Sequence, residues 1–258
     1  MGSASREALA KASAALSGGL AAATGAELLA AAAQIDAAPA LLGALGDASA
    51  ASGAKAQLVD RLFGGASADT RGLLVAAVSE AWSNPAELVS GIEELGLRAE
   101  ADANPALADE LLAVASAIDS SHELELGLGS KLSAPEAKAA LVQRLFTGKI
   151  SDSALGVVSY LAANPRGRRI GSALCESARL AADQGGSELA TVTVAAPLSE
   201  SQQGRLAELL QQSAGRPVRV TTVVDPSLIG GVRVQIGDNV IDGSIRSRLE
   251  DLRLQLAG

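Results

Sequence analysis

The chain has 258 residues, which is long enough for two or three compact units with cores of their own. Hydrophobic residues make up 48% and charged residues 19%, a globular composition that excludes wholesale disorder. Only 2% of the residues are aromatic, so alanine and leucine must build the core, and such small side chains favour closely packed helices. The net charge of −8 is unevenly divided: residues 1–130 carry 6 basic and 17 acidic side chains, and residues 131–258 carry 15 basic and 12 acidic ones.

The acidic first half limits the partners that the chain can bind. Phosphates and anionic lipid headgroups are repelled by such a surface, which argues against nucleic-acid binding. No segment approaches the roughly 20 apolar residues of a membrane span, so we expect no direct membrane insertion. A basic or amphipathic helix of another protein would be a compatible partner. The alternative is that the carboxylates only keep an alanine-rich surface soluble.

An internal repeat occupies the first two-thirds of the chain. Residues 27–63 align with residues 110–146 at a constant offset of 83, and 19 of the 37 positions are identical. Both copies continue to an Asn-Pro pair, Asn84-Pro85 in the first and Asn164-Pro165 in the second, and each pair is predicted to begin a long helix. The sequence therefore predicts two tandem helical bundles, residues 1–105 and 106–187.

Helix signals also occur inside the copies. Ser133 to Glu136 predicts a capping box in the second copy. In the first copy we expect a helix from Leu73 to Trp82. Leu74, Val78 and Trp82 form an apolar stripe on it, which is either core or an anchor for a partner.

Three arginines, Arg166, Arg168 and Arg169, crowd the start of the helix predicted after Asn164-Pro165. The helix dipole disfavours positive charge there, and an acidic partner would compensate for it. Intramolecular pairing or simple solvation is the alternative.

The hydrophobic period changes to two beyond residue 188, which indicates strands. A strand is predicted at Leu189–Val194, a capped helix from Ser199 to about Ser213, and a second strand at Pro217–Asp225. The pair Gly230-Gly231 predicts a bulge or tight bend before an alternating strand that returns through a turn at Gly237. Asp242 and Ser244 would then cap a last helix with one apolar stripe. The sequence thus predicts a small α/β domain, residues 188–258, with a short mixed sheet.

No pattern in the chain indicates covalent chemistry. His122 is the only histidine and has no accompanying nucleophile motif, and Cys175 is the only cysteine. One histidine and one cysteine do not supply a metal-ligand set, and no phosphate-binding loop is complete. We therefore expect no catalytic residue, no cofactor and no bound metal.

The order of motifs near the C-terminus resembles the closing segment of the δ subunit of the rotary ATP synthase, the homologue of the oligomycin-sensitivity-conferring protein. The motif residues are Asp225, Gly230, Gly231, Gly237, Asp242 and Ser244. The second copy and the tail, from about Ala106 onward, resemble that whole protein. Residues 1 to about 105 depart from the usual shorter form by duplication. With the predicted elements, this resemblance implies a mainly α fold, with two helical bundles followed by the small α/β domain.

The resemblance also implies a function and a location. Family members are non-catalytic stator subunits that join the catalytic head to the b peripheral stalk, so the expected partners are the N-terminal helices of the α subunits and the b subunit. The expected location is the cytoplasmic face of the plasma membrane, as a peripheral part of the synthase. The alternative is a free-standing helical adaptor unrelated to the synthase.

Overall fold

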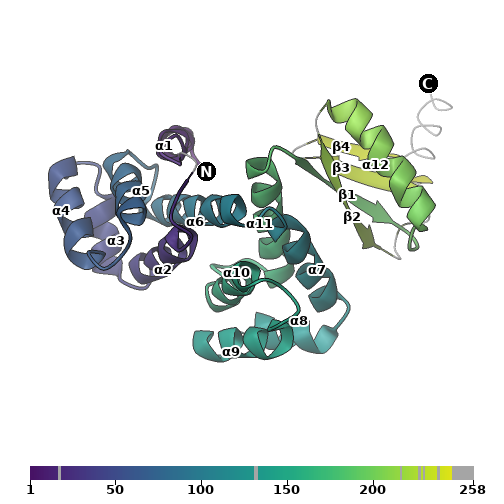
Figure 1. Cartoon of the computed structure of the whole chain (residues 1–258), viewed down its shortest axis with the longest axis horizontal. Helices are drawn as coiled ribbons and strands as arrows, with labels where there is room; N and C mark the ends of the chain where they lie inside the picture. Colours follow the sequence, from purple (N-terminus) through teal and green to yellow (C-terminus); the bar gives the residue numbers. More distant parts are fainter. Residues whose placement is uncertain are drawn as a thin grey trace, which may run out of the picture. The chain divides into compact units, whose positions relative to one another are not determined.

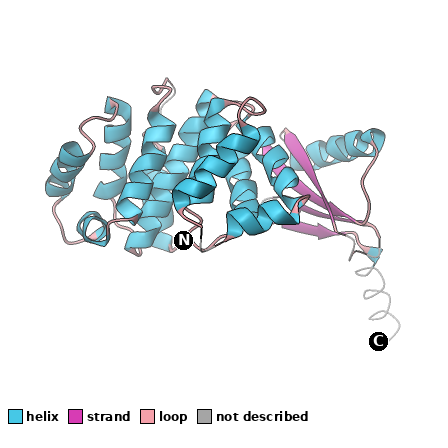
Figure 2. Ribbon diagram, turned by 90° about the horizontal axis from the view of Figure 1, so that it is seen from below, coloured by secondary structure: helices cyan, strands magenta, loops and turns pink. Residues whose placement is uncertain are grey.

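The computed structural model describes residues 1–16, 19–130, 133–215, 217–225, 228, 230–236 and 239–245. The chain divides into two compact units, residues 1–181 and 182–258. Helices alone build the first unit in its described part, and the strands belong to the second (Figures 1 and 2). This confirms the predicted fold class, a mainly α protein with a small α/β part near the C-terminus.

The helices of the first unit follow the internal repeat. In the first copy they are α1 (Ser3–Ser13), α2 (Thr24–Asp36), α3 (Pro39–Gly46), α4 (Ser52–Leu62), α5 (Ala68–Ser79) and α6 (Pro85–Ala103). In the second they are α7 (Leu107–Asp119), α8 (His122–Gly129), α9 (Pro135–Phe146), α10 (Asp152–Ala163) and α11 (Ile170–Gln184). Helices α2 to α6 thus recur in order as α7 to α11.

Equivalent positions of the two copies are buried alike. The pairs Leu28 and Leu111, Ile35 and Ile118, Leu45 and Leu128, and Val59 and Val142 are all at most 2% exposed. Even the lysines match, because Lys55 and Lys138 are both buried, and the Lys55 Nζ donates to the Val78 carbonyl oxygen at 3.0 Å. Identical sequence in the two copies therefore reflects identical packing demands.

Helix α6 is shared by both copies. It is the last helix of the first copy, because it follows α5 in the same way that α11 follows α10 in the second copy. It also comes just before the first repeated helix of the second copy, α7, as α1 comes just before α2 in the first. It packs against α1, α2, α3 and α5 of the first copy and against α7 of the second, and 11 of its 19 residues are buried. Because α6 belongs to both copies, residues 1–181 form one unit, and the division into bundles at residue 105 stays a prediction.

Two glycines let other elements approach α6 closely. A Cβ at Gly91 would lie 2.0 Å from the Trp82 ring, and one at Gly96 would lie 3.0 Å from the Leu29 side chain. The small residues of α6 therefore decide how tightly the first copy closes around it.

The prediction for Asn164-Pro165 is wrong. Asn84 does cap α6, with its Oδ1 accepting from the Glu87 amide at 3.0 Å, but Asn164 starts no helix and α11 begins at Ile170. The reason is a left-handed turn, with φ of 46° at Arg166 and 80° at Gly167, which interrupts helical geometry.

Two smaller predictions also differ from the structure. Helix α9 begins at Pro135 with Ala134 as N-cap and no side-chain cap, so Ser133 lies one residue too early to form the predicted capping box. Helix α5 ends at Ser79 because Glu80 takes an extended backbone conformation, and Trp82 therefore lies beyond the helix rather than on it.

The second unit is a mixed sheet with one covering helix. Its elements are β1 (Glu188–Val194), α12 (Glu200–Ala214), β2 (Val218–Val224), β3 (Val232–Ile236) and β4 (Asn239–Asp242). The strand order is β2-β1-β3-β4, with β1 parallel to β2 and antiparallel to β3, and β4 antiparallel to β3. The Ser199–Gln202 capping box of α12 is present as predicted. Alternate residues of β1 join Leu210 and Val234 in the core.

Among the described residues, no single helix is long and apolar enough to span a membrane. Helices α2 and α3 reach that length and composition only as a pair bent by 106°, and Leu28, Ile35 and Leu45 of this pair are fully buried in the core.

Candidate partner-binding site

The predicted apolar stripe of the first copy lies in its core. Leu74 and Val78 are fully buried on α5. Trp82 is 8% exposed, and its ring lies against Gly91 of α6 while its Nε1 donates to the Ala77 carbonyl oxygen at 2.8 Å. This placement agrees with the core alternative. A role for these three side chains as partner anchors stays a prediction that the chain by itself does not test.

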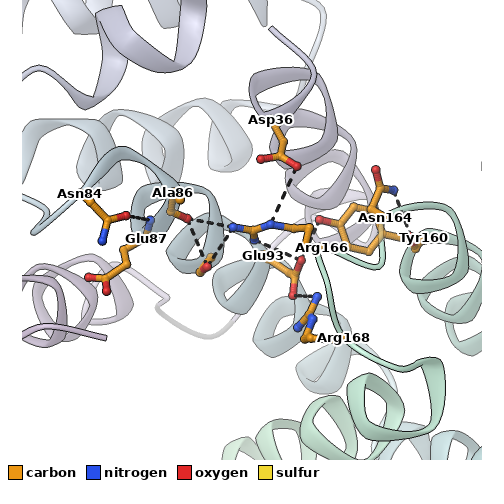
Figure 3. Close-up of polar contacts among 10 residues, drawn as sticks. Asp36, Asn84, Ala86, Glu87, Glu93, Tyr160, Asn164, Arg166 and Arg168 are labelled. Carbon is orange, nitrogen blue, oxygen red and sulfur yellow. Dashed lines mark hydrogen bonds and ion pairs between the residues drawn. The ribbon is translucent and has the colours of Figure 1, made fainter. Parts of the chain in front are cut away.

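Arg166 points back toward helices of the first copy (Figure 3). Its Nη2 donates to the Ala86 carbonyl oxygen at 2.9 Å and to the Ser90 Oγ at 3.1 Å, both on the first turns of α6. Its Nη1 lies 3.6 Å from a carboxylate oxygen of Glu93, and its Nε lies 3.8 Å from one of Asp36 at the end of α2. The guanidinium therefore connects the second copy to two helices of the first.

Glu93 is the centre of this polar cluster (Figure 3). Its side chain is 5% exposed and lies 2.7 Å from the Arg168 Nη2, and it accepts from the Tyr160 hydroxyl of α10 at 3.0 Å. Burial and the neighbouring Glu93 carboxylate raise the pKa of Tyr160, because both disfavour a phenolate there. Arg168 also lies 3.6 Å from the Glu176 carboxylate.

The three arginines predicted as a group thus differ in surroundings. Arg166 and Arg168 are paired within the chain, in agreement with the intramolecular alternative. Arg169 is exposed, and no ion pair to its side chain is found among the described residues. An acidic partner at these positions stays a prediction, and Arg169 offers the most accessible charge of the three.

A second carboxylate, Glu100, lies about two turns further along α6 than Glu93. Glu100 is 5% exposed, and its carboxylate accepts from the Ser153 hydroxyl of α10 and from the Ala26 amide of α2. Burial raises the pKa of Glu100, because the charged form loses hydration that these two hydrogen bonds only partly replace.

One pair of glutamates, Glu27 and Glu110, repeats with the sequence. Glu27 of α2 accepts from the amide and hydroxyl of Ser67, the N-cap of α5, at 2.9 and 2.7 Å. Glu110 of α7 accepts from the amide and hydroxyl of Ser151, the N-cap of α10, at 2.8 and 2.7 Å. A hydrogen bond from Thr70 lowers the pKa of Glu27. Burial opposes this effect at Glu110, but its hydrogen bonds from Ser151 and Asn104 outweigh burial, so its pKa is also lowered.

The predicted motif residues of the second unit shape turns. The Asp225 amide donates to the Val194 carbonyl oxygen at 2.8 Å. Gly230 and Gly231 take φ of 149° and 83°, and a Cβ at Gly231 would lie 2.5 Å from the Gly243 carbonyl oxygen. Asp242 accepts from the Ser244 amide at 2.9 Å and pairs with Arg233 at 3.0 Å, and these hydrogen bonds, from Ser244 first, lower its pKa.

Part of this motif lies outside the described residues, namely Gly237 and the predicted last helix beyond Ile245. The role of the motif residues as structural residues of the family motif stays a prediction.

The remaining reactive side chains are those of His122 and Cys175. His122 begins α8 with its side chain 80% exposed, and Cys175 is partly buried on α11, where burial raises the pKa of the thiol. In the described part of the chain, no three His, Cys, Asp or Glu side chains converge as a metal site would require.

Sequence reasoning missed the four glutamates that hold helices together, Glu27, Glu93, Glu100 and Glu110. Glu27 and Glu110 carried a usable signal, because both belong to the identical positions of the repeat. Glu93 and Glu100 carried none, since they look like any charged residues of a long helix.

The described polar clusters hold helices to one another, and the fold is a duplicated helical unit followed by a small α/β unit. These features define the class as a mainly α protein built on a duplicated helical unit.

Comparison with known proteins gives the family. A model of the ATP synthase delta (OSCP) subunit family matches residues 97–256. ATP synthase subunit delta of Leifsonia xyli subsp. xyli is 46% identical, with all of both chains covered. That of Nocardia farcinica is 39% identical over 98% of this chain and 96% of its own. The chain belongs to the ATP synthase delta (OSCP) subunit family and is a non-catalytic structural subunit of the synthase.

Among solved structures, a chain of the Toxoplasma gondii mitochondrial ATP synthase hexamer is 23% identical, over 63% of this chain and 97% of its own. The TM-score of 0.38 is too low to support a conclusion about function.

Proposed function

We propose that this chain is the joint of the synthase stator, linking the catalytic head to the b peripheral stalk so that rotor torque drives proton-coupled ATP synthesis. The family match over residues 97–256, extended along the whole chain by a relative that is 46% identical, is the observation that carries the proposal. The protein would act at the cytoplasmic face of the plasma membrane, attached through its partners.

The two units would bind different partners. Amphipathic N-terminal helices of the α subunits would bind the helical unit in a helix-in-groove manner, and the far end of b would bind the α/β unit. The acidic residues of the first 130 positions would steer basic partner helices. A joint that transmits torque without dissociating needs nanomolar or tighter affinity, about 12 kcal/mol or more.

The duplication leaves two versions of the contact with the head: each copy binds one α helix, or one copy replaces a contact that b makes in shorter family members. Titration calorimetry of the full chain with a peptide of the α N-terminus separates them, because the first version requires two peptides per chain. Hydrogen exchange in the same mixture would locate the protection in one copy or in both.

A membrane pull-down tests the proposal against the free-standing adaptor. Tagged full-length chain, incubated with detergent-solubilised membranes, should recover both the α and b subunits of the synthase. Recovery of neither subunit would overturn the stator assignment and leave the adaptor.

A further inference from the structure

Arg166 combines an unusual backbone with a mostly buried charge. Among the described residues it is the only non-glycine residue with a positive φ, 46°, a conformation that L-residues adopt at a cost. Its side chain is only 16% exposed. Both features persist only where the surroundings compensate for them, so the contacts of this side chain must stabilise the turn.

Those contacts all reach α2 and α6, the helices that precede the second copy in the chain. Arg166 belongs to the turn between α10 and α11, and its guanidinium reaches the Ala86 carbonyl oxygen and the Ser90 hydroxyl on α6, together with the Asp36 carboxylate on α2 (Figure 3). In the first copy, the chain after the corresponding Asn-Pro pair simply continues as helix. The departure from the repeat at this point is therefore what creates the connection.

Glu93 completes the connection as the buried counter-ion. Its carboxylate forms ion pairs with Arg166 and Arg168 and accepts a hydrogen bond from the Tyr160 hydroxyl. Groups from α10 and from the turn after it therefore converge on one side chain of α6. Removing the arginine charge would leave a buried carboxylate with fewer partners, which is more costly than losing an exposed ion pair.

We propose that Arg166 is a latch that couples the two copies of the repeat, so that they unfold as one cooperative body instead of two. Glu93 is its positioning partner. The inference does not depend on the proposed function, because every contact is internal to the chain. In a stator, such coupling would keep the helical unit from acting as a hinge under load.

Urea unfolding of the full chain, read by pulse hydrogen exchange and mass spectrometry, tests the latch. Peptides from α2–α5 report on the first copy and peptides from α7–α10 on the second. In the natural chain the two sets should share one midpoint. In Arg166→Gly they should separate by on the order of 0.5 M urea. Glycine suits a positive φ, so this change removes the contacts without adding backbone strain.

Arg169→Gly is the matched control, because Arg169 is exposed in the same turn, and its midpoints should stay together. Glu93→Gln keeps an acceptor for Tyr160 but removes the charge, and it should separate the midpoints as Arg166→Gly does; it decides the matter if Arg166→Gly fails to fold. Separate midpoints in the natural chain, shared midpoints in both test variants, or equal separation in Arg169→Gly would overturn the latch.

Discussion

Each copy of the repeat uses one glutamate to hold the N-terminus of another helix. Glu27 and Glu110 accept hydrogen bonds from the N-cap serines Ser67 and Ser151, so a single side chain fixes both the cap and the approach of two helices. The lowered pKa values mean that the ionised form makes these bonds in the folded state.

Glu27→Ala and Glu110→Ala should each lower the free energy of unfolding, by about 1–2 kcal/mol, because the partly buried donors at the start of α5 or α10 lose their acceptor. The folded-state pKa lies below the ordinary value, so this stabilisation is present above the unfolded-state pKa and is lost as pH falls through the folded-state pKa. Urea unfolding at pH 7 and under acidic conditions measures it. Glu208→Ala, at an exposed position of α12, should change little.

Glu100 has the opposite pH dependence. Its pKa is raised by burial, so the folded state holds the proton more tightly, and stability falls as pH rises from below the ordinary value of 4.5 through the folded-state pKa. Glu100→Gln keeps an acceptor for Ser153 and cannot ionise. We expect it to raise the melting temperature at pH 7 by a few degrees, on the order of 1 kcal/mol.

That gain should shrink to nothing in calorimetric scans well below pH 4.5, where the natural side chain is protonated in both states. A variant that is less stable than the natural chain at pH 7 would mean that the carboxylate is stabilising after all.

At the scale of elements, α6 decides how the helical unit is built. Helices of both copies pack against α6. Its glycines Gly91 and Gly96 lie where Trp82 and Leu29 contact it. An amphipathic pattern in the sequence indicates one apolar stripe and gives no sign that a helix will be covered from two directions.

A pair of glycine substitutions tests this arrangement. Gly91→Ala should lower the free energy of unfolding by about 1–3 kcal/mol, because the new methyl overlaps the Trp82 ring. Gly72→Ala, on α5 with nothing within 4 Å of the added atom, should raise it by about 0.5–1 kcal/mol through helix propensity. Denaturant unfolding followed by Trp82 fluorescence measures both. Equal effects of the two changes would contradict the close packing at Gly91.

At the scale of the whole molecule, the shared helix means that the second copy is incomplete without residues that precede it. A chain shortened to residues 106–258 loses α6, and with it Glu93 and Glu100, the partners of Tyr160 and Ser153 on α10. Hydrogen exchange in α10 should therefore be at least tenfold faster than in the full chain, since each tenfold is about 1.4 kcal/mol of lost protection.

A chain that begins at residue 85 retains α6 and is the matched comparison. Its α10 should exchange more slowly than that of the 106–258 chain. Equal exchange in the two shortened chains would show that α6 does not support the second copy.

The sequence by itself determined the repeat, the mainly α class, the mixed sheet and the family. The repeat follows from identical residues at a fixed offset, which needs only a comparison of the chain with itself. The other features are local: a change of hydrophobic period at residue 188, and glycine and capping residues at fixed places. Each acts over a few residues, so one chain suffices to recognise them.

Only the tertiary structure shows which charged side chains are buried and which of them are paired. Arg166 and Arg168 follow an Asn-Pro pair that should begin a helix, yet a left-handed turn directs Arg166 to α6, about 80 residues earlier in the chain. Glu93 and Glu100 look like surface charges of a long helix until α2 and α10 cover them. Burial and pairing depend on which distant helices meet, and periodicity along one helix carries no information about that meeting.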